Sequence, residues 1–118
     1  MESGERPEHE IFESALLANN HDLLDKFEQD EEGVFLLAHQ NTEGFTRLLL
    51  QLENDLNLFF AKDCVHNQGG RFLESVKGLV SDLLYKRKIP DQSRTVLERI
   101  LNIILDFYSA KNNQDPKL

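Results

Sequence analysis

The acidic run that begins at Glu28, EQDEEG, has the residue types of a calcium-binding loop. Placing Gly33 at the sixth position of such a loop puts carboxylates at the first, third and fifth, where oxygen ligands are needed. These carboxylates are Glu28, Asp30 and Glu32. The twelfth position requires a bidentate glutamate and holds His39. We therefore interpret the run as a helix start, where acidic side chains are stabilised by the helix dipole. A calcium-responsive switch remains the third functional hypothesis.

Other residues that could do chemistry stand apart from one another. Cys64 and His66 lie two residues apart, without the paired spacing and four ligands of a zinc site, so we interpret Cys64 as a packed thiol. Gly70 and Arg71 could offer an anion site, although a short glycine pair is more typical of a turn. The chain contains neither of the two common glycine-rich phosphate motifs. We expect no enzyme activity, no metal and no cofactor.

The chain has one basic concentration. Lys86, Arg87 and Lys88 are consecutive, and Arg94 follows. We predict that these four residues bind an acidic segment of a partner protein. Short basic runs also occur in nuclear-localisation signals and in solvated loops, and both alternatives stay open.

The remaining charge is strongly acidic. Residues 1–32 carry a net charge of −9 and residues 33–118 carry +1, which gives the formal net charge of −8. Nucleic-acid-binding proteins usually carry a basic excess, so we expect no nucleic-acid partner. The acidic face of residues 22–32 could instead dock against the basic residues of a second copy. Homotypic assembly is therefore the second functional hypothesis.

Length and composition predict one soluble domain. At 118 residues, of which 40% are hydrophobic, the chain can bury a stable core without disulfides or bound metal ions. Its single cysteine cannot form an internal disulfide and fits a reducing compartment. The acidic N-terminus lacks the features of a signal peptide, and no apolar run is long enough for a membrane span. We expect a cytoplasmic or nuclear protein with no membrane contact.

Apolar spacing predicts short helices in the N-terminal part. A helix from Pro7 to about Asn20 would place Ile11, Ala15 and Ala18 on one face. Asn20 is the expected cap of a short second helix. A third short helix follows the acidic run.

Three longer helices follow. Thr42 is the expected N-cap of the first, whose apolar stripe consists of Phe45, Leu48, Leu49, Leu52, Leu56, Phe59 and Phe60. Leu50 and Leu58 lie off this stripe, so we expect burial on a second side. The next stripe consists of Phe72, Val76, Leu79, Val80, Leu83 and Leu84. The last helix begins near Asp91 or Ser93 and is apolar nearly all round, so we expect it to be the most buried.

The stretch DEEGVFLLAHQNTEGFTRLLLQL, residues 30–52, resembles the second and third helices of an armadillo-type repeat. In that family a short helix leads through a glycine into a long helix, and Gly44 takes the place of the glycine. A similar entry begins at Gly70, 26 residues later, whereas the family repeats near every 40 residues. A complete first helix between them is therefore missing. The resemblance covers about half the chain and implies a right-handed helical array.

The sequence therefore predicts an all-α domain of five to six helices, either an armadillo-like array or a compact bundle. We expect an acidic disordered leader over residues 1–6, one domain over residues 7–109 and a flexible tail or linker over residues 110–118. The expected function is a non-catalytic adaptor or scaffold module, the N-terminal part of a larger protein, that binds a helix or acidic segment of another protein.

Overall fold

The computed structural model describes residues 8–61, 70–86 and 88–114, and side chains over 11–61, 72–86 and 88–109. These residues form six helices and no strand, which confirms the all-α class. The helices are α1 (Glu8–Asn19), α2 (His21–Gln29), α3 (Glu31–Gln40), α4 (Thr42–Ala61), α5 (Gly70–Tyr85) and α6 (Asp91–Gln114). Helix α6 thus continues past the expected boundary at residue 109. None of the helices in these ranges is long and apolar enough to cross a membrane.

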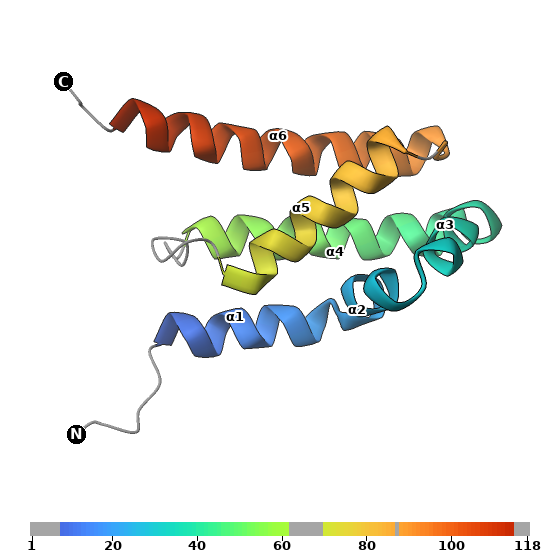
Figure 1. The fold of residues 1–118 in the computed structure, drawn as a ribbon, viewed down its shortest axis with the longest axis horizontal. Coiled ribbons are helices and arrows are strands. Elements are labelled where there is room, and N and C mark those ends of the chain that lie inside the picture. Colours follow the sequence, from blue (N-terminus) through green and yellow to red (C-terminus); the bar gives the residue numbers. More distant parts are fainter. Residues whose placement is uncertain (1–7, 62–69, 87, 115–118) are drawn as a thin grey trace.

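The helices are arranged as a thin slab of 49 × 39 × 20 Å. Figure 1 shows α4 and α6 running in the same direction, with α1 on the other side of α4 and running the opposite way. Helix α5 crosses α4 obliquely and packs against α6 and α1. The short helices α2 and α3 lie near the start of α4. The slab is therefore about two helices thick, since one helix with its side chains is about 10 Å across.

The core lies where α5 covers α4 and α6. Five residues of the predicted α4 stripe, Phe45, Leu49, Leu52, Leu56 and Phe59, are fully buried, whereas the other two, Leu48 and Phe60, are partly buried and pack against the core. All six residues of the α5 stripe are buried as well, and Leu73 joins them. Phenylalanine rings from α4 and α5 meet edge to face.

Two expectations about burial are wrong. Leu50 and Leu58 do not pack against a second layer, because α4 has one open face, and they are 43% and 44% exposed. Helix α6 is not the most buried element, since it forms the edge of the slab in Figure 1. Leu105 is exposed, and Phe107 and Tyr108 are only partly buried.

The buried face of α1 also differs from the expected one. Ile11, Ala15 and Ala18 are exposed, whereas Leu16 is buried and Phe12 and Leu17 pack against the core. The reason is that the larger apolar side chains lie on the other side of the helix and remove more apolar area from water.

The helix junctions in the first half are fixed by polar side chains. Asp30 separates α2 from α3, and its carboxylate accepts a hydrogen bond from the Gly33 amide. The acidic run is thus a helix start, as predicted, and the chain is helical on both sides of Asp30 rather than forming a twelve-residue loop. Asn41 caps α4 in the same way, through the Gly44 amide. The expected cap, Thr42, is helical instead, and its hydroxyl donates to the Ala38 carbonyl.

Candidate functional site

The predicted basic residues lie around the connection between α5 and α6. Helix α5 ends at Tyr85, and Lys86 continues its last turn because the Lys86 amide donates to the Asp82 carbonyl. Lys88 lies in the connection, and Arg94 lies in the first turns of α6. Arg87 is outside the described residues.

Two of the cations are partly neutralised by carboxylates on their own helices. Lys86 Nζ lies 3.4 Å from a carboxylate oxygen of Asp82, and Arg94 Nε donates to Glu98 at 3.2 Å. Lys88 is exposed, and no ion pair joins it to another described residue. Among the three described cations of this site, Lys88 is therefore the one most available to a partner's carboxylate.

The backbone of the connection is held in place by the rest of the fold. The Nε2–H of His39, at the end of α3, donates to the Lys88 carbonyl at 2.7 Å. The His39 ring in turn meets the Phe35 ring edge-on, with centroids 4.7 Å apart. Ile89 inserts its side chain into the core next to Lys88. The ammonium of Lys88 thus projects from a fixed position.

A buried contact secures the start of α6. The hydroxyls of Thr46 on α4 and Ser93 on α6 lie 2.9 Å apart, and both residues are buried. Further along, Arg99 of α6 forms a two-pronged pair with Glu53 of α4, at 2.9 and 2.7 Å. The hydrogen bonds from Arg99 to Glu53 raise the pKa of the guanidinium. The connection therefore begins and ends on helices that are fixed relative to α4.

Sequence reasoning missed Tyr85 at this site. Its side chain is 74% exposed, the largest value among the large apolar and aromatic residues of the described ranges. The signal that could have found it is its position, because it follows two buried leucines at the end of an apolar stripe and immediately precedes the cations.

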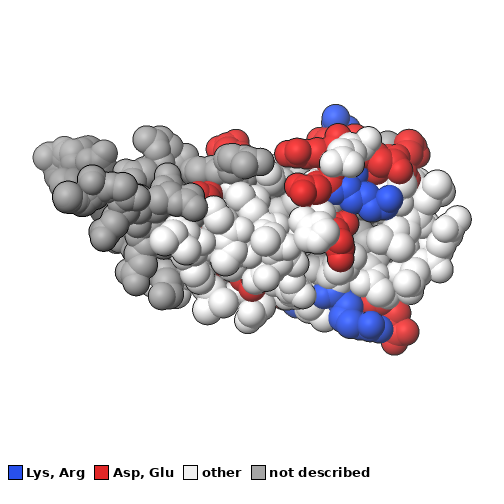
Figure 2. All heavy atoms as spheres, turned by 90° about the horizontal axis from the view of Figure 1, so that it is seen from below, with Lys and Arg blue, Asp and Glu red and all other residues white. Residues whose placement is uncertain are grey.

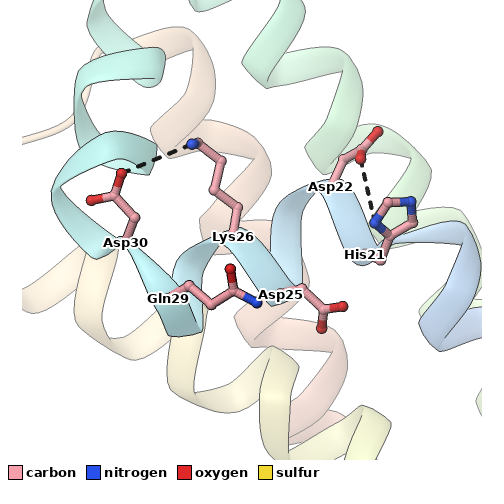
Figure 3. Close-up of a pocket in the computed structure, with 6 residues that line it drawn as sticks. All are labelled: His21, Asp22, Asp25, Lys26, Gln29 and Asp30. Atoms are coloured by element: carbon pink, nitrogen blue, oxygen red, sulfur yellow. Dashed lines mark ion pairs between the residues drawn. The ribbon is translucent and has the colours of Figure 1, made fainter.

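The predicted acidic face coincides with an open hollow along α2. It is lined by His21, Asp22, Asp25, Lys26, Gln29 and Asp30. Figure 3 shows Lys26 directed toward Asp30, at 3.9 Å, and His21 toward Asp22, at 3.4 Å. Figure 2 shows charged side chains gathered at the end of the molecule that carries α2, whereas the middle of this face is mostly uncharged. The acidic and basic surfaces are thus separate.

The remaining candidates lie mostly outside the described residues. Cys64 and His66 lie outside the described residues, as does the side chain of Arg71. In the part of the chain that the structure describes, no three histidine, cysteine or acidic side chains gather to hold a metal ion.

The hydroxyl of Tyr108 accepts a hydrogen bond from Lys77 and raises the pKa of that ammonium. This contact joins α5 to α6. Because the pKa of Lys77 is higher in the folded protein, the contact stabilises the fold fully at pH values below the ordinary lysine pKa. This stabilisation is lost as the pH rises through the raised pKa of the folded protein. The contact therefore acts unchanged at neutral pH.

The fold and this site define a small all-α domain with a rigidly held basic connection. No family model matches the chain, and no curated protein or solved structure matches it. The short helix α3 leading into the long helix α4 has the order expected from the armadillo resemblance, which itself stays a prediction.

Proposed function

We propose that this chain is a non-catalytic protein–protein interaction domain, an adaptor or scaffold module, that binds an acidic segment of another protein at the α5–α6 connection. The observation that carries the proposal is Lys88, an exposed cation that pairs with no described residue and is held in place by His39. Lys86 and Arg94 flank it, and Arg87 belongs to the same run.

The cations of the connection favour an acidic rather than a basic partner segment, and the acidity of the rest of the chain limits such a segment to this position. The chain has a net charge of −8, so most of its surface repels an acidic segment. Charge complementarity acts mainly on the orientation of the encounter and on the choice of partner. The resemblance to armadillo-type repeats agrees with this role, because arrays of helices present extended binding surfaces.

The proposal is tested by capture from a cell lysate with the intact domain and two charge-reversed variants. Lys88→Glu removes the proposed contact. Arg47→Glu is its matched control, because Arg47 on α4 is also exposed and pairs with no described residue. We expect a partner that is retained by the intact domain and by Arg47→Glu, and whose affinity for Lys88→Glu is roughly five- to tenfold weaker. Equal retention by all three proteins excludes the connection as the site.

A second candidate function is homotypic assembly. The observation that favours it is the hollow along α2, whose lining includes Asp22, Asp25 and Asp30 and which could receive the basic connection of another copy. The two functions differ in the mass of the isolated domain, because assembly makes it depend on concentration and salt.

A further inference from the structure

The aromatic ring of Tyr85 lies beside the proposed acidic-partner site. Tyr85 ends α5 and is 74% exposed, whereas Leu83 and Leu84 before it point into the core. Tyrosine side chains combine a large apolar ring with a polar tip, and they are enriched among the residues that dominate binding energy at protein interfaces. The exposed tyrosine thus offers a partner apolar contact in addition to the ion pairs of the neighbouring cations.

The ring and the free cation are close enough to contact one short partner segment. Tyr85 and Lys88 are three residues apart, and three residues span at most about 11 Å. Lys86, between them, is already engaged with Asp82. The backbone positions of Tyr85 and Lys88 therefore both lie within the length of a peptide of a few residues.

Ion pairs alone would give this site only a low affinity for a partner. An exposed ion pair changes affinity by less than about fivefold, since each ammonium exchanges water for carboxylate and loses side-chain freedom. Burial of apolar surface against an aromatic ring contributes more per residue. Because His39 and Ile89 hold the backbone at Lys88, little further ordering of that residue's backbone is needed on binding.

We propose that the connection recognises an acidic segment of another protein in which an apolar side chain lies next to a carboxylate. The apolar side chain covers the ring of Tyr85, and the carboxylate pairs with Lys88. His39 is a positioning residue, because it acts through the Lys88 carbonyl. This inference rests on the proposed function and names the chemistry of the partner.

A second copy of the chain fits this surface less well. The hollow along α2 supplies carboxylates, but its lining consists only of charged and polar residues. It therefore has no apolar side chain to place on Tyr85. A second copy and another protein would both offer carboxylates to the cations of the site. The Tyr85 ring is therefore the feature that favours a different protein over a second copy.

The test uses three fluorescent peptides of equal length and their binding to the intact domain by fluorescence anisotropy. The first combines glutamates with interspersed leucines. In the second, serines replace the leucines, and in the third, glutamines replace the glutamates. We expect the first peptide to bind roughly tenfold more tightly than the serine peptide, which loses contact with the ring, and about two- to fivefold more tightly than the glutamine peptide, which loses the ion pair. Tyr85→Ala should reduce its affinity to that of the serine peptide, whereas Tyr85→Phe should bind like the intact domain.

Two controls distinguish binding at this site from nonspecific hydrophobic binding. Leu105→Ala removes another exposed apolar side chain, on α6, and should bind the first peptide as the intact domain does. His39→Ala should weaken binding several-fold, and His39→Gln, which retains a donor, should restore much of it. If His39→Gln fails to restore binding, then His39 does not act through the Lys88 carbonyl.

The outcomes distinguish the inference from the function on which it rests. If the leucine and serine peptides bind equally and Lys88→Glu weakens both, the acidic-partner function stands and the role of Tyr85 is wrong. If no peptide binds in a way that depends on Lys88, both fail. If the bound fraction of the first peptide falls as the concentration of the domain rises, a second copy occupies the surface and the inference is wrong.

Discussion

At the scale of single residues, the most constrained polar group is the carboxylate of Asp55. It is buried on α4, and its described partner is Asn20, whose side-chain amide donates to it at 2.8 Å. The same amide donates to the Leu16 carbonyl at the end of α1. Asn20 therefore joins three helices by satisfying a buried acceptor and an open helix end.

We predict that Asn20→Ala lowers the free energy of unfolding by about 2 kcal/mol, because the Asp55 carboxylate is left buried with no described donor. Asn19→Ala is the control: the side chain of Asn19 is exposed, and its change should cost less than about 0.5 kcal/mol. Urea unfolding followed by circular dichroism measures both. Equal losses for the two variants would show that the buried contact contributes nothing.

Sequence reasoning located Asn20 but gave it the wrong partner. It was expected to cap α2, and it does precede that helix, yet its side chain makes no capping hydrogen bond. The side-chain NH2 group instead donates to Asp55, 35 residues away, and to the Leu16 carbonyl, and these two contacts set the orientation of the side chain. The helix start in the acidic run was easier to predict, because the groups that form it lie within three residues of one another, as the Asp30 carboxylate and the Gly33 amide show. Local polar contacts are readable from sequence, whereas long-range ones depend on the packing.

At the scale of helices, α3 and α4 begin in the same way. Each follows a capping residue, Asp30 or Asn41, and each has a glycine at the third helical position, Gly33 or Gly44. A side chain at either glycine would collide with the cap, since a Cβ on Gly44 would lie 2.5 Å from Asn41 Nδ2 and one on Gly33 would overlap the Asp30 carboxylate. A larger residue at either position would therefore have to displace the capping side chain.

The change in the free energy of unfolding caused by alanine should therefore differ among the three glycines Gly33, Gly44 and Gly78. Gly78→Ala, in the exposed middle of α5, meets nothing within 4 Å and should raise the free energy of unfolding by about 0.5–1 kcal/mol. At Gly33 and Gly44 the same gain is offset by loss of a cap, which costs about 1 kcal/mol. Thermal and urea unfolding of the three variants provide the comparison. An equal gain at all three positions would mean that the caps move aside freely.

The positions of the helices were largely predictable from the sequence, but the way they pack against one another was not. The three-to-four spacing of large apolar residues identified the buried sides of α4 and α5. The same method chose Ile11, Ala15 and Ala18 for the inner face of α1, where small residues make the pattern weak. It also overestimated the burial of α6, because a helix rich in apolar residues can still lie at the edge of a layer. Tyr85 was missed because off-stripe residues carry no periodic signal.

At the scale of the whole molecule, the slab carries two surfaces of opposite sign toward the same end. The acidic hollow lies along α2, and the basic connection is tied to α3 through His39 (Figure 1). Each surface is partly neutralised by its own residues, through Lys26 with Asp30 in the hollow and Lys86 with Asp82 at the connection. Internal pairing reduces the charge that either surface offers to a second copy.

Simple energetics favour a monomer. Exposed ion pairs contribute about 0–1 kcal/mol each, whereas a dissociation constant of about 1 µM corresponds to roughly 8 kcal/mol. The few charges of the two surfaces cannot supply that difference. The net charge of −8 also makes two copies repel each other.

We therefore predict that the isolated chain sediments with its monomer mass of 13.7 kDa. The measurement is sedimentation velocity from about 5 to 500 µM protein, at low and high salt, because a charge-driven assembly grows with concentration and dissolves in salt. A mass that rises at low salt would replace the adaptor function by homotypic assembly. In that case Lys88→Glu and Asp25→Lys should each abolish association, and mixing the two variants should restore it, since each then offers the charge that the other lacks.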